Sequence, residues 1–343
     1  MSIPTLEEVA RAAGVSRATA SRVVNESPTV GIEARQSVER AVAQLGYVPN
    51  RAARSLVTRR NDSIGVVIAE PSGRIFGDPF FAEVLRGISA GLAARQLALV
   101  LVMSQSPEEE RQAERYLTAG HVDGVILFSL HGNDPLPEHL QSRGIPVVVG
   151  GEPPHGARVS YVDNDNYGGA IAAVNHLIDR GRTRIATITG PRDMPAGVTR
   201  RLGYHDALRA AGRTPDADLE ESGGFTREGG QRAMEVLLQR CPDIDAVFAA
   251  SDLMAAGALS ALYAAGRRVP EDVAVVGFDD SIIALSTQPA LSSVHQSMEA
   301  TGRELASVLL QTIDARDHVL RRVVLDTELI VRQSSGGPPT GKS

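Results

Sequence analysis

From Ile64 onward, this 343-residue chain alternates between short apolar runs and longer stretches with helical periodicity. Near-continuous apolar strands are typical of parallel sheets that helices cover on both faces. The alternation extends over roughly 270 residues, which favours two sheets over one. The sequence therefore predicts an α/β core of doubly wound parallel sheets. The apolar runs are IGVVIA (64–69), LALVLVM (97–103), GVILF (124–128), PVVVG (146–150), RIATITG (184–190), AVFAAS (246–251) and VAVVGF (273–278).

The alternation is interrupted at YVDNDNYGG, residues 161–169, where Asn, Asp and Gly predict a loop and a break between the two sheets. Parallel α/β sheets place ligands at the carboxyl ends of their strands. Binding residues are therefore expected in the loops that follow the apolar runs. The polar and aromatic candidates there are Phe80, Phe81, Asp163, Arg200, Phe225, Ser251 and Asp279.

The charge of the chain is unevenly distributed. Residues 1–60 contain nine arginines and five acidic residues, a net charge of +4, whereas the whole chain carries -6 and the remainder therefore -10. A basic segment on an acidic body points to a polyanionic partner, because clustered positive charge gains affinity by releasing counterions from phosphates. On charge alone, a solvated basic surface explains the excess equally well.

The stretch TLEEVARAAGVSRATASRVVN, residues 5–25, predicts two short helices joined by a sharp turn. Thr5 and Glu8 have the spacing of a capping box, Gly14 permits the turn, and Ser16 can cap the second helix. Such a pair forms a helix-turn-helix, whose second helix lies in the DNA major groove. The inner faces are Leu6, Val9, Ala10 and Ala13, then Thr19, Ala20, Val23 and Val24, and a third helix over 33–45 adds Ala34, Val38, Ala41, Val42 and Leu45.

Arg17, Ala18 and Arg22 are expected on the outer face of the second helix. An arginine there can pair with guanine O6 and N7, which contributes about 1–3 kcal/mol of discrimination, and Ala18 can contact a thymine methyl. Ser16, Thr19 and Asn25 are better suited to phosphate contacts and caps. The candidate DNA-contacting residues are Ser16, Arg17, Ala18, Thr19, Ser21, Arg22, Asn25, Asn50, Arg51, Arg54 and Leu56.

The run T-L-x-x-V-A-x-x-A-G-V-S-x-x-T-x-S-R-V-V-N, the G-Y-x-P-N turn and the A-R-S-L segment resemble the lactose/galactose repressor family. The resemblance covers the chain from about Thr5 to Arg332. It implies a DNA-binding headpiece at 1–48, a hinge helix at 49–61 and a periplasmic-binding-protein-like core at 62–332. Two mild departures are Glu8, where Asp is common, and Ala20, where valine is usual.

The family's core implies two lobes that are discontinuous in sequence. The expected N-lobe is about 62–161 plus 292–320, and the expected C-lobe is about 162–291 plus 321–332. The composition of the remaining segment, 333–343, predicts a flexible tail.

The resemblance also implies roles for single residues. Leu56 matches a hinge leucine that wedges into the DNA minor groove, which unstacks a base step and bends the duplex. Without the preceding motif, the default interpretation of Leu56 is a hydrophobic residue that packs the linker. Arg200 matches an effector-contacting arginine, and the segment with Phe80 and Phe81 covers the ligand.

The chemistry of the candidate effector residues favours a sugar. Arg200 facing Asp279 suits vicinal hydroxyls, and Phe225 can stack on the apolar face of a ring. By position alone, Arg200 could pair with a surface acid, and Phe80 or Phe81 could belong to the core. Asp163 is either structural or ligand-facing.

Four further residues near these loops have expected structural roles. Asp252 and Asp280 are expected to cap the helices that follow them. Gly150 and Gly151 are expected to leave one side of the pocket without a side-chain contact.

Enzyme and receptor functions fit the sequence poorly. Walker-type, H-E-x-x-H and G-x-S-x-G motifs are absent, and the single Cys241 excludes an internal disulfide and a multi-cysteine zinc site. His205 and Asp206 are adjacent, and adjacent helical residues point apart. No catalytic residue, cofactor or metal is expected. A sugar-binding receptor of the same fold would be exported, whereas this sequence has neither a secretory leader nor a membrane-spanning run, so we expect a cytoplasmic protein.

The sequence therefore predicts a transcriptional regulator, and more specifically a repressor, that binds a pseudopalindromic operator as a homodimer. A small ligand, a sugar or alternatively a purine or another metabolite, is expected to control operator affinity, in a direction that the sequence leaves open. No apolar heptads follow Arg332, so no coiled-coil tetramer is expected.

Overall fold

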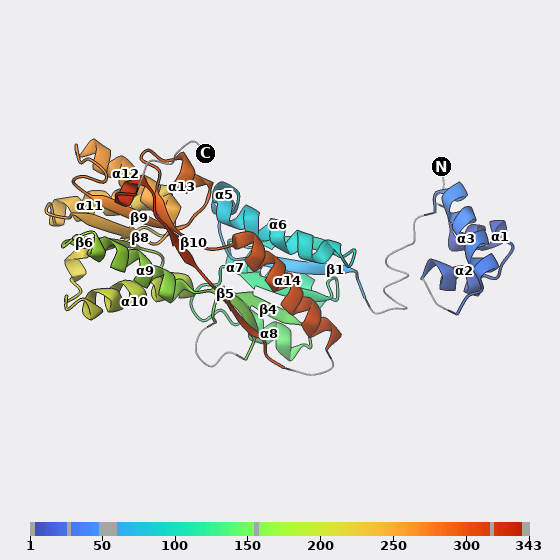
Figure 1. Cartoon of the computed structure of the whole chain (residues 1–343). Coiled ribbons are helices and arrows are strands. Elements are labelled where there is room, and N and C mark those ends of the chain that lie inside the picture. The colour runs from blue at the N-terminus through green and yellow to red at the C-terminus, as the bar shows by residue number, and fades with distance from the viewer. Residues whose placement is uncertain (1–3, 26–28, 48–59, 154–157, 316–318, 338–343) are drawn as a thin grey trace. The chain divides into compact units, whose positions relative to one another are not determined.

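The computed structural model describes residues 4–25, 29–47, 60–153, 158–315 and 319–337. These residues belong to two compact units, and the boundary between them in the sequence lies between Asp62 and Ser63. The described residues of the first unit, which contains the headpiece, form helices but no strand, and the second unit, the core, contains two α/β lobes (Figure 1). This division confirms the expected fold class.

Three helices make up the described part of the headpiece: α1 (Leu6–Ala12), α2 (Arg17–Val24) and α3 (Ile32–Leu45). The predicted capping box is present, because Thr5 N donates to Glu8 Oε2 at 2.7 Å and Glu8 N donates to Thr5 Oγ1 at 3.3 Å. Gly14 has a φ of 67°, which a residue with a side chain rarely adopts, so it makes the turn between α1 and α2.

The small core of the headpiece lies where the three helices meet. Val9, Ala20 and Val38 are fully buried, and Ala10, Val23 and Ala41 are nearly so. Leu45 was expected here as well, but it lies on the last turn of α3, directly before the left-handed Gly46, and is exposed. Leu6, Ala13, Val24 and Val42 pack against this core as predicted, whereas Thr19 and Ala34 are only half-buried.

The N-lobe contains a six-stranded sheet in which all neighbouring strands are parallel. The strand order is β11-β5-β4-β3-β1-β2. The strands are β1 (Ser63–Ile68), β2 (Ala98–Met103), β3 (Gly124–Phe128), β4 (Val147–Gly150), β5 (Ser160–Asn164) and β11 (Arg322–Leu325). The helices are α5 (Ser72–Gly77), α6 (Pro79–Ala93), α7 (Pro107–Thr118), α8 (Leu136–Ser142) and α14 (Met298–Asp314).

The C-lobe repeats this plan with one antiparallel edge pair, β10 and β12. Its strand order is β12-β10-β9-β8-β6-β7. The strands are β6 (Ile185–Thr189), β7 (Glu220–Ser222), β8 (Ala246–Ala249), β9 (Ala274–Asp279), β10 (Ser292–His295) and β12 (Glu328–Ile330). The helices are α9 (Asn166–Asp179), α10 (Pro195–Ala210), α11 (Arg227–Arg240), α12 (Asp252–Ala264) and α13 (Ile282–Ser286), with short 3-10 turns at Ala217–Leu219 and Gln333–Ser335.

Helices cover both faces of each sheet (Figure 1). In the N-lobe, α6 and α14 pack on one face, and α7 and α8 pack on the other. In the C-lobe, α11 and α12 cover one face, and α9 and α10 cover the other. The central strands β1, β3, β8 and β9 are consequently buried along their whole length, as the apolar runs predict.

The chain passes between the lobes three times, each time a few residues later than expected. The predicted loop at 161–164 is instead the end of β5 in the N-lobe sheet. Similarly, β10 belongs to the C-lobe and β11 to the N-lobe. The polar residues Asp163 and Asn164 are compatible with a strand here because they line a cavity between the lobes.

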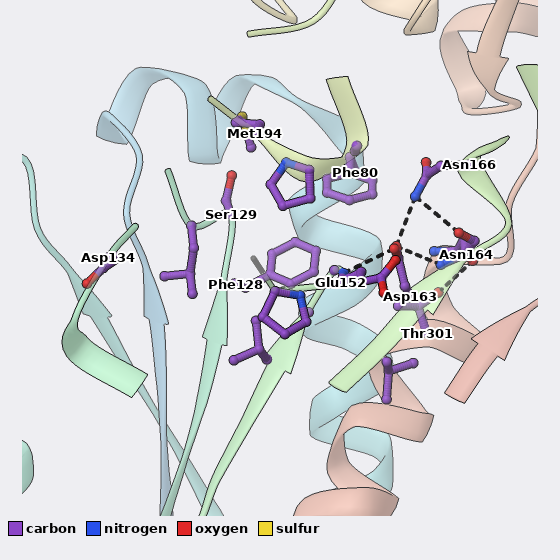
Figure 2. A pocket seen from close by; sticks show the side chains of 18 of the residues that line it. Phe80, Phe128, Ser129, Asp134, Glu152, Asp163, Asn164, Asn166, Met194 and Thr301 are labelled. Carbon is purple, nitrogen blue, oxygen red and sulfur yellow. Dashed lines mark hydrogen bonds between the residues drawn. The ribbon is translucent and has the colours of Figure 1, made fainter. Parts of the chain in front are cut away.

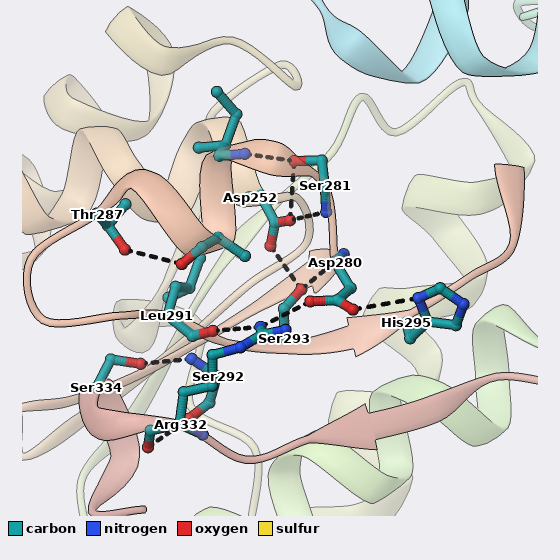
Figure 3. A network of polar contacts seen from close by, with 12 residues as sticks. Asp252, Asp280, Ser281, Thr287, Leu291, Ser292, Ser293, His295, Arg332 and Ser334 are labelled. Carbon is teal, nitrogen blue, oxygen red and sulfur yellow. Dashed lines mark hydrogen bonds and ion pairs between the residues drawn. The ribbon is translucent and has the colours of Figure 1, made fainter. Parts of the chain in front are cut away.

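Residues 333–335 do not form the start of a flexible tail. Ser334 and Ser335 are buried, Ser292 N donates to Ser334 Oγ at 2.8 Å, and Ser334 Oγ donates to Val275 O at 2.6 Å (Figure 3). Small polar side chains can be buried here because their hydroxyls have hydrogen-bond partners. Residues 338–343 lie outside the described residues.

Candidate functional site

The second helix of the headpiece, α2, exposes the three side chains predicted to contact bases. Arg17, Ala18 and Arg22 are exposed, whereas Ala20 and Val23 face the core. Arg17 Nε lies 3.6 Å from Glu7 Oε1, and both side chains are highly exposed. Such a surface ion pair contributes only about 0–1 kcal/mol, so it leaves Arg17 available to a partner.

The other predicted DNA-contacting residues of α2 are also helix caps or half-buried. Ser16 Oγ accepts a hydrogen bond from Thr19 N at 3.0 Å, as expected of an N-cap. Asn25 follows the helix, and its Nδ2 donates to Ser21 Oγ at 3.3 Å. The remaining candidates lie outside the part of the chain that the structure describes, so their roles stay predictions; they are Asn50, Arg51, Arg54 and Leu56.

A cavity of about 540 Å³ lies between the two lobes of the core. Its wall is built at the carboxyl ends of the strands, where parallel α/β sheets bind ligands (Figure 2). Of the seven residues that the sequence nominates for this site, the structure brings six to the wall: Phe80, Asp163, Arg200, Phe225, Ser251 and Asp279.

Arg200 projects from α10 and is almost fully buried at the cavity wall. Its Nε donates to Asn166 Oδ1 at 2.8 Å, and its Nη1 donates to Ala250 O at 2.6 Å and to Asp279 Oδ1 at 3.4 Å. The guanidinium also stacks on the ring of Phe278, 3.6 Å from its centroid. These contacts fix the guanidinium, and they use Nε and Nη1 but not Nη2.

Asp279 faces Arg200 from the end of β9. Its Oδ1 also accepts from Gln296 Nε2 at 2.6 Å. Burial raises the pKa of Asp279 to about 7, the charge of Arg200 opposes this shift, and the nearby Asp78 adds to it. A buried guanidinium and carboxylate in this arrangement can donate to and accept from neighbouring hydroxyls of one ligand.

The backbone at the end of β9 is strained. Asp279 and Asp280 have φ values of 109° and 51°, which residues other than glycine rarely adopt. The two carboxylates consequently diverge: Asp279 lines the cavity, whereas Asp280 pairs with Arg332 Nη1 at 2.6 Å and His295 Nδ1 at 3.2 Å (Figure 3). Strain of this kind often accompanies functional sites.

Asp163, for which the sequence left a structural and a ligand-facing role open, makes structural hydrogen bonds and also lines the cavity. Its Oδ1 accepts from Asn164 N at 2.8 Å and from Asn166 Nδ2 at 2.9 Å, and its Oδ2 accepts from Glu152 N at 3.1 Å (Figure 2). Because Asn166 in turn holds Arg200, Asp163 connects the cavity to the segment that crosses between the lobes.

Three phenylalanines line the cavity. The rings of Phe80 and Phe128 are stacked, with centroids 5.4 Å apart, and Phe225 contributes from the C-lobe. The prediction that Phe81 also lines the cavity is wrong, because its ring is buried in the N-lobe core. Adjacent helical residues point in different directions, so α6 can turn only one of the two toward the ligand.

The β4 side of the cavity carries side chains, contrary to expectation. A Cβ at Gly150 would lie 2.1 Å from the ring of Phe128. The Phe128 ring therefore occupies the space that a side chain at position 150 would fill. Glu152 also lines this side. Phe128 ends the apolar run GVILF, and its position at the carboxyl end of a strand was the signal that could have identified it.

A group of contacts that we call the lobe bridge joins the two lobes beside the cavity. Glu70, on the N-lobe, is buried, and its Oε1 contacts Arg74 Nη1 at 2.5 Å and His131 Nε2 at 3.2 Å. The other ring nitrogen of His131 lies 3.0 Å from Asp193 Oδ2, on the C-lobe. In addition, Gly132 N donates to Asp193 O at 2.8 Å. One buried carboxylate thus anchors a polar connection between the lobes.

Both units resemble known proteins. Residues 5–50 match the model for bacterial regulatory proteins of the lacI family, and residues 174–335 match that for a periplasmic binding protein-like domain. The chain is 50% identical to the HTH-type transcriptional regulator CelR of Thermobifida fusca, over 96% of this chain and 98% of that one. This chain belongs to the lacI family. The lacI-family regulator is also 33% identical to the ribose operon repressor of Escherichia coli K12, over 96% of this chain and 99% of that one.

Solved structures of similar proteins include two that span nearly the whole regulator. A complex of the transcriptional regulator CelR with cellobiose matches with a TM-score of 0.78 and 48% identity, over 96% of this chain and 99% of that one. A lac repressor dimer bound to operator and the anti-inducer ONPF matches with a TM-score of 0.86 and 26% identity, over 97% and 99%. The regulator is accordingly a DNA-binding transcription factor and not an enzyme.

Two predicted helix caps in the regulator have other roles. Ser251, not Asp252, caps α12 by accepting from Met254 N at 3.3 Å. Asp252 is buried and accepts from Ser281 N at 2.8 Å and from Ser293 Oγ at 2.6 Å, which joins three segments of the C-lobe (Figure 3). Asp280 is likewise no cap, because Ser281 caps α13.

The described residues of the regulator contain no cluster of three or more His, Cys, Asp or Glu side chains that could hold a metal ion. His205 and Asp206 point apart, as predicted: His205 contacts Glu220, and Asp206 contacts Tyr167 and Arg209. None of the described helices is long and apolar enough to cross a membrane.

Proposed function

We propose that this regulator represses transcription by binding a pseudopalindromic operator as a homodimer, and that a sugar bound between the lobes of the core controls its operator affinity. The observation that carries the proposal is the cavity, in which the buried pair Arg200 and Asp279 shares one wall with aromatic rings. Charged donors and acceptors suit vicinal hydroxyls, and aromatic rings suit the apolar face of a sugar.

Cellobiose is the first candidate ligand. The supporting comparison is the similar regulator CelR, which has been solved as a cellobiose complex. The cavity volume of about 540 Å³ lies within the ordinary range for small-molecule sites. Carboxylates at Asp78, Asp163 and Asp279 offer the hydroxyls of a disaccharide several acceptors.

A purine is the second candidate. The stacked rings of Phe80 and Phe128 favour a flat ligand. A purine base has fewer donors for the carboxylates of the wall than a sugar has. We therefore rank it below cellobiose.

The dimer is proposed on two grounds. A two-fold operator is bound by a two-fold protein, and one headpiece makes too few contacts for useful specificity. The core also exposes large apolar side chains on α5 and α13, namely Phe76, Ile282 and Leu285, which a second copy could bury. The site of action is the cytoplasm, where the DNA lies.

The mechanism follows from the position of the cavity between two lobes. A ligand that binds one degree of lobe closure better than another shifts the population of the two states. Operator affinity changes if the two states differ in how they present the headpieces and the hinge around Leu56. The sign of the response, release or tightening, depends on which state binds DNA.

The first test is selection of binding sites from a randomised duplex pool by the full-length protein at one stated salt concentration. A two-fold site with a flexible pyrimidine–purine step at its centre is expected. The selection is repeated once with cellobiose and once with cell extract. Either addition provides a corepressor if the protein needs one to bind DNA. Absence of enrichment under all three conditions would contradict the proposed operator binding.

A further inference from the structure

We propose that the cavity accepts its sugar only in an uncharged form and rejects phosphorylated or acidic forms of the same sugar. This inference rests on the proposed sugar-binding function and narrows its ligand class. The distribution of charge over the cavity wall carries it.

On the cavity wall, acidic residues outnumber cations around Arg200. Asp78, Asp163 and Asp279 line the cavity, and Arg200 is the cation beside them. Arg200 pairs with Asp279 at 3.4 Å, and Asp163 and the buried Asp252 also act electrostatically on its guanidinium. Because Asp279 pairs with this arginine and two further acidic residues lie near it, its positive charge is partly offset before any ligand binds.

The second cation of the wall, Arg74, is neutralised in the same way. Its Nη1 lies 2.5 Å from Oε1 of the buried Glu70. Three more carboxylates line the cavity, at Asp134, Glu138 and Glu152, and no ion pair with another described residue neutralises them. Among the described residues, the wall therefore contains six acidic residues and two arginines, and both arginines are already paired.

An anionic ligand would meet carboxylates that are already poorly solvated. Burial raises the pKa of both Asp78 and Asp163, which shows that solvent stabilises their charge incompletely. Bringing a like charge into such an environment is strongly unfavourable. Sugar hydroxyls, by contrast, donate to carboxylate oxygens without adding charge. The wall thus favours neutral polyols over their anionic derivatives.

The preference for an uncharged ligand indicates which classes of reaction can produce the ligand and which can remove it. The ligand must be supplied by a step that leaves it uncharged, such as glycoside hydrolysis or uptake without phosphorylation. A kinase or an oxidase that acts on the same sugar would remove the signal by converting the ligand into an anion.

The test compares two open-chain derivatives of cellobiose that differ in charge, neutral cellobiitol and anionic cellobionate, with cellobiose itself. Isothermal titration calorimetry on the full-length protein at pH 7.5 is expected to show cellobionate binding at least about 100-fold more weakly than cellobiitol. Equal affinities for the two would overturn the inference.

If none of the three binds, a thermal-shift panel of free sugars and their 6-phosphates replaces them. Hits confined to uncharged sugars support the inference. A phosphorylated hit overturns it but leaves the sugar function intact. A panel without hits overturns the sugar function, and the inference with it.

A variant tests whether charge causes the discrimination. Asp78 caps α6, with its Oδ1 accepting from Phe80 N at 3.0 Å, and asparagine is an equally good N-cap, so Asp78→Asn keeps the fold. We expect it to reduce the affinity ratio of cellobiitol to cellobionate about tenfold. Glu108→Gln removes the same charge from the exposed surface of α7 and is expected to leave the ratio unchanged. An unchanged ratio in Asp78→Asn would mean that charge is not the cause.

Discussion

The headpiece and the core differ in how exposed their candidate binding residues are and in which neighbours hold them in place. In the headpiece, Arg17 and Arg22 are exposed, and the start of their helix is set by Ser16, a near neighbour in sequence. In the core, Arg200 and Asp279 are buried and are held by residues that lie tens of positions away along the chain. A substitution in the first group should therefore change recognition alone, whereas one in the second should change both recognition and stability.

The largest effect is expected from Arg200→Ala in the core. It removes the partner of the buried Asp279 and leaves Asn166 Oδ1 without its donor. Breaking a buried ion pair on one side costs about 3–5 kcal/mol of unfolding free energy. Urea unfolding is expected to show this loss, and calorimetry is expected to show no cellobiose binding, while operator affinity without ligand remains.

The matched control for this prediction is Arg201→Ala on the same helix. Arg201 is half-buried, pairs with the buried Glu220 and does not line the cavity. Its substitution is expected to preserve cellobiose binding. If both variants lose binding equally, the effect comes from damage to α10 and not from the cavity.

The next effect is a pH dependence of core stability. The folded pKa of Asp279, about 7, is raised above the ordinary value of 3.8, so between these values the folded state holds a proton that the unfolded chain has released. The contribution of this residue to unfolding free energy therefore falls as pH rises, by at most about 1.4 kcal/mol per pH unit. Urea unfolding of the wild type and of Asp279→Asn at pH 5 and pH 7 measures it. If the unfolding free energy of the two proteins changes with pH in the same way, the pKa of Asp279 is not raised in the folded state.

Arg17→Ala probes the exposed side of the comparison. It is expected to cost about 1–3 kcal/mol of discrimination at one operator position, if Arg17 pairs with a guanine, and to leave headpiece stability nearly unchanged. Selection from a randomised site measures the preference, with Arg40→Ala on the exposed face of α3 as the control. A base preference that survives unchanged removes Arg17 from the base-contacting residues.

The smallest effect is expected at the lobe bridge. His131→Ala removes the residue that connects Glu70 to Asp193, and a loss of about 1 kcal/mol in ligand affinity, or roughly fivefold, is expected because the two lobes lose one connection beside the cavity. His139→Ala is the control, because the side chain of His139 contacts Glu114 within the N-lobe. Calorimetric affinities that agree for the two variants would show that the bridge does not contribute to closure.

The same contrast explains which features could be predicted from the sequence. The capping box, the turn at Gly14 and the N-cap at Ser16 depend on residues within a few positions of each other. The buried strands depend on continuous apolar runs, whose carboxyl ends pointed to Asp279. Short-range pattern was sufficient in each of these cases, whereas Arg200 was identified through its match to the family's effector-contacting arginine.

Features that depend on distant neighbours could not be predicted. Whether Phe80 or Phe81 faces the cavity depends on how α6 packs, and the role of Asp252 depends on Ser281 and Ser293, which arrive from other segments. The end of β5 has the composition of a loop and becomes a strand only because its polar side chains face a cavity. In each case the deciding contact is made by a residue far away in the chain.

The most direct measurement is the affinity of the full-length regulator for its selected operator with and without saturating cellobiose, by fluorescence anisotropy at fixed salt. The cavity assignment predicts a change of about tenfold or more, in one direction, that is absent in Arg200→Ala. An operator affinity that stays the same while calorimetry shows cellobiose bound would contradict control of DNA binding by the cavity.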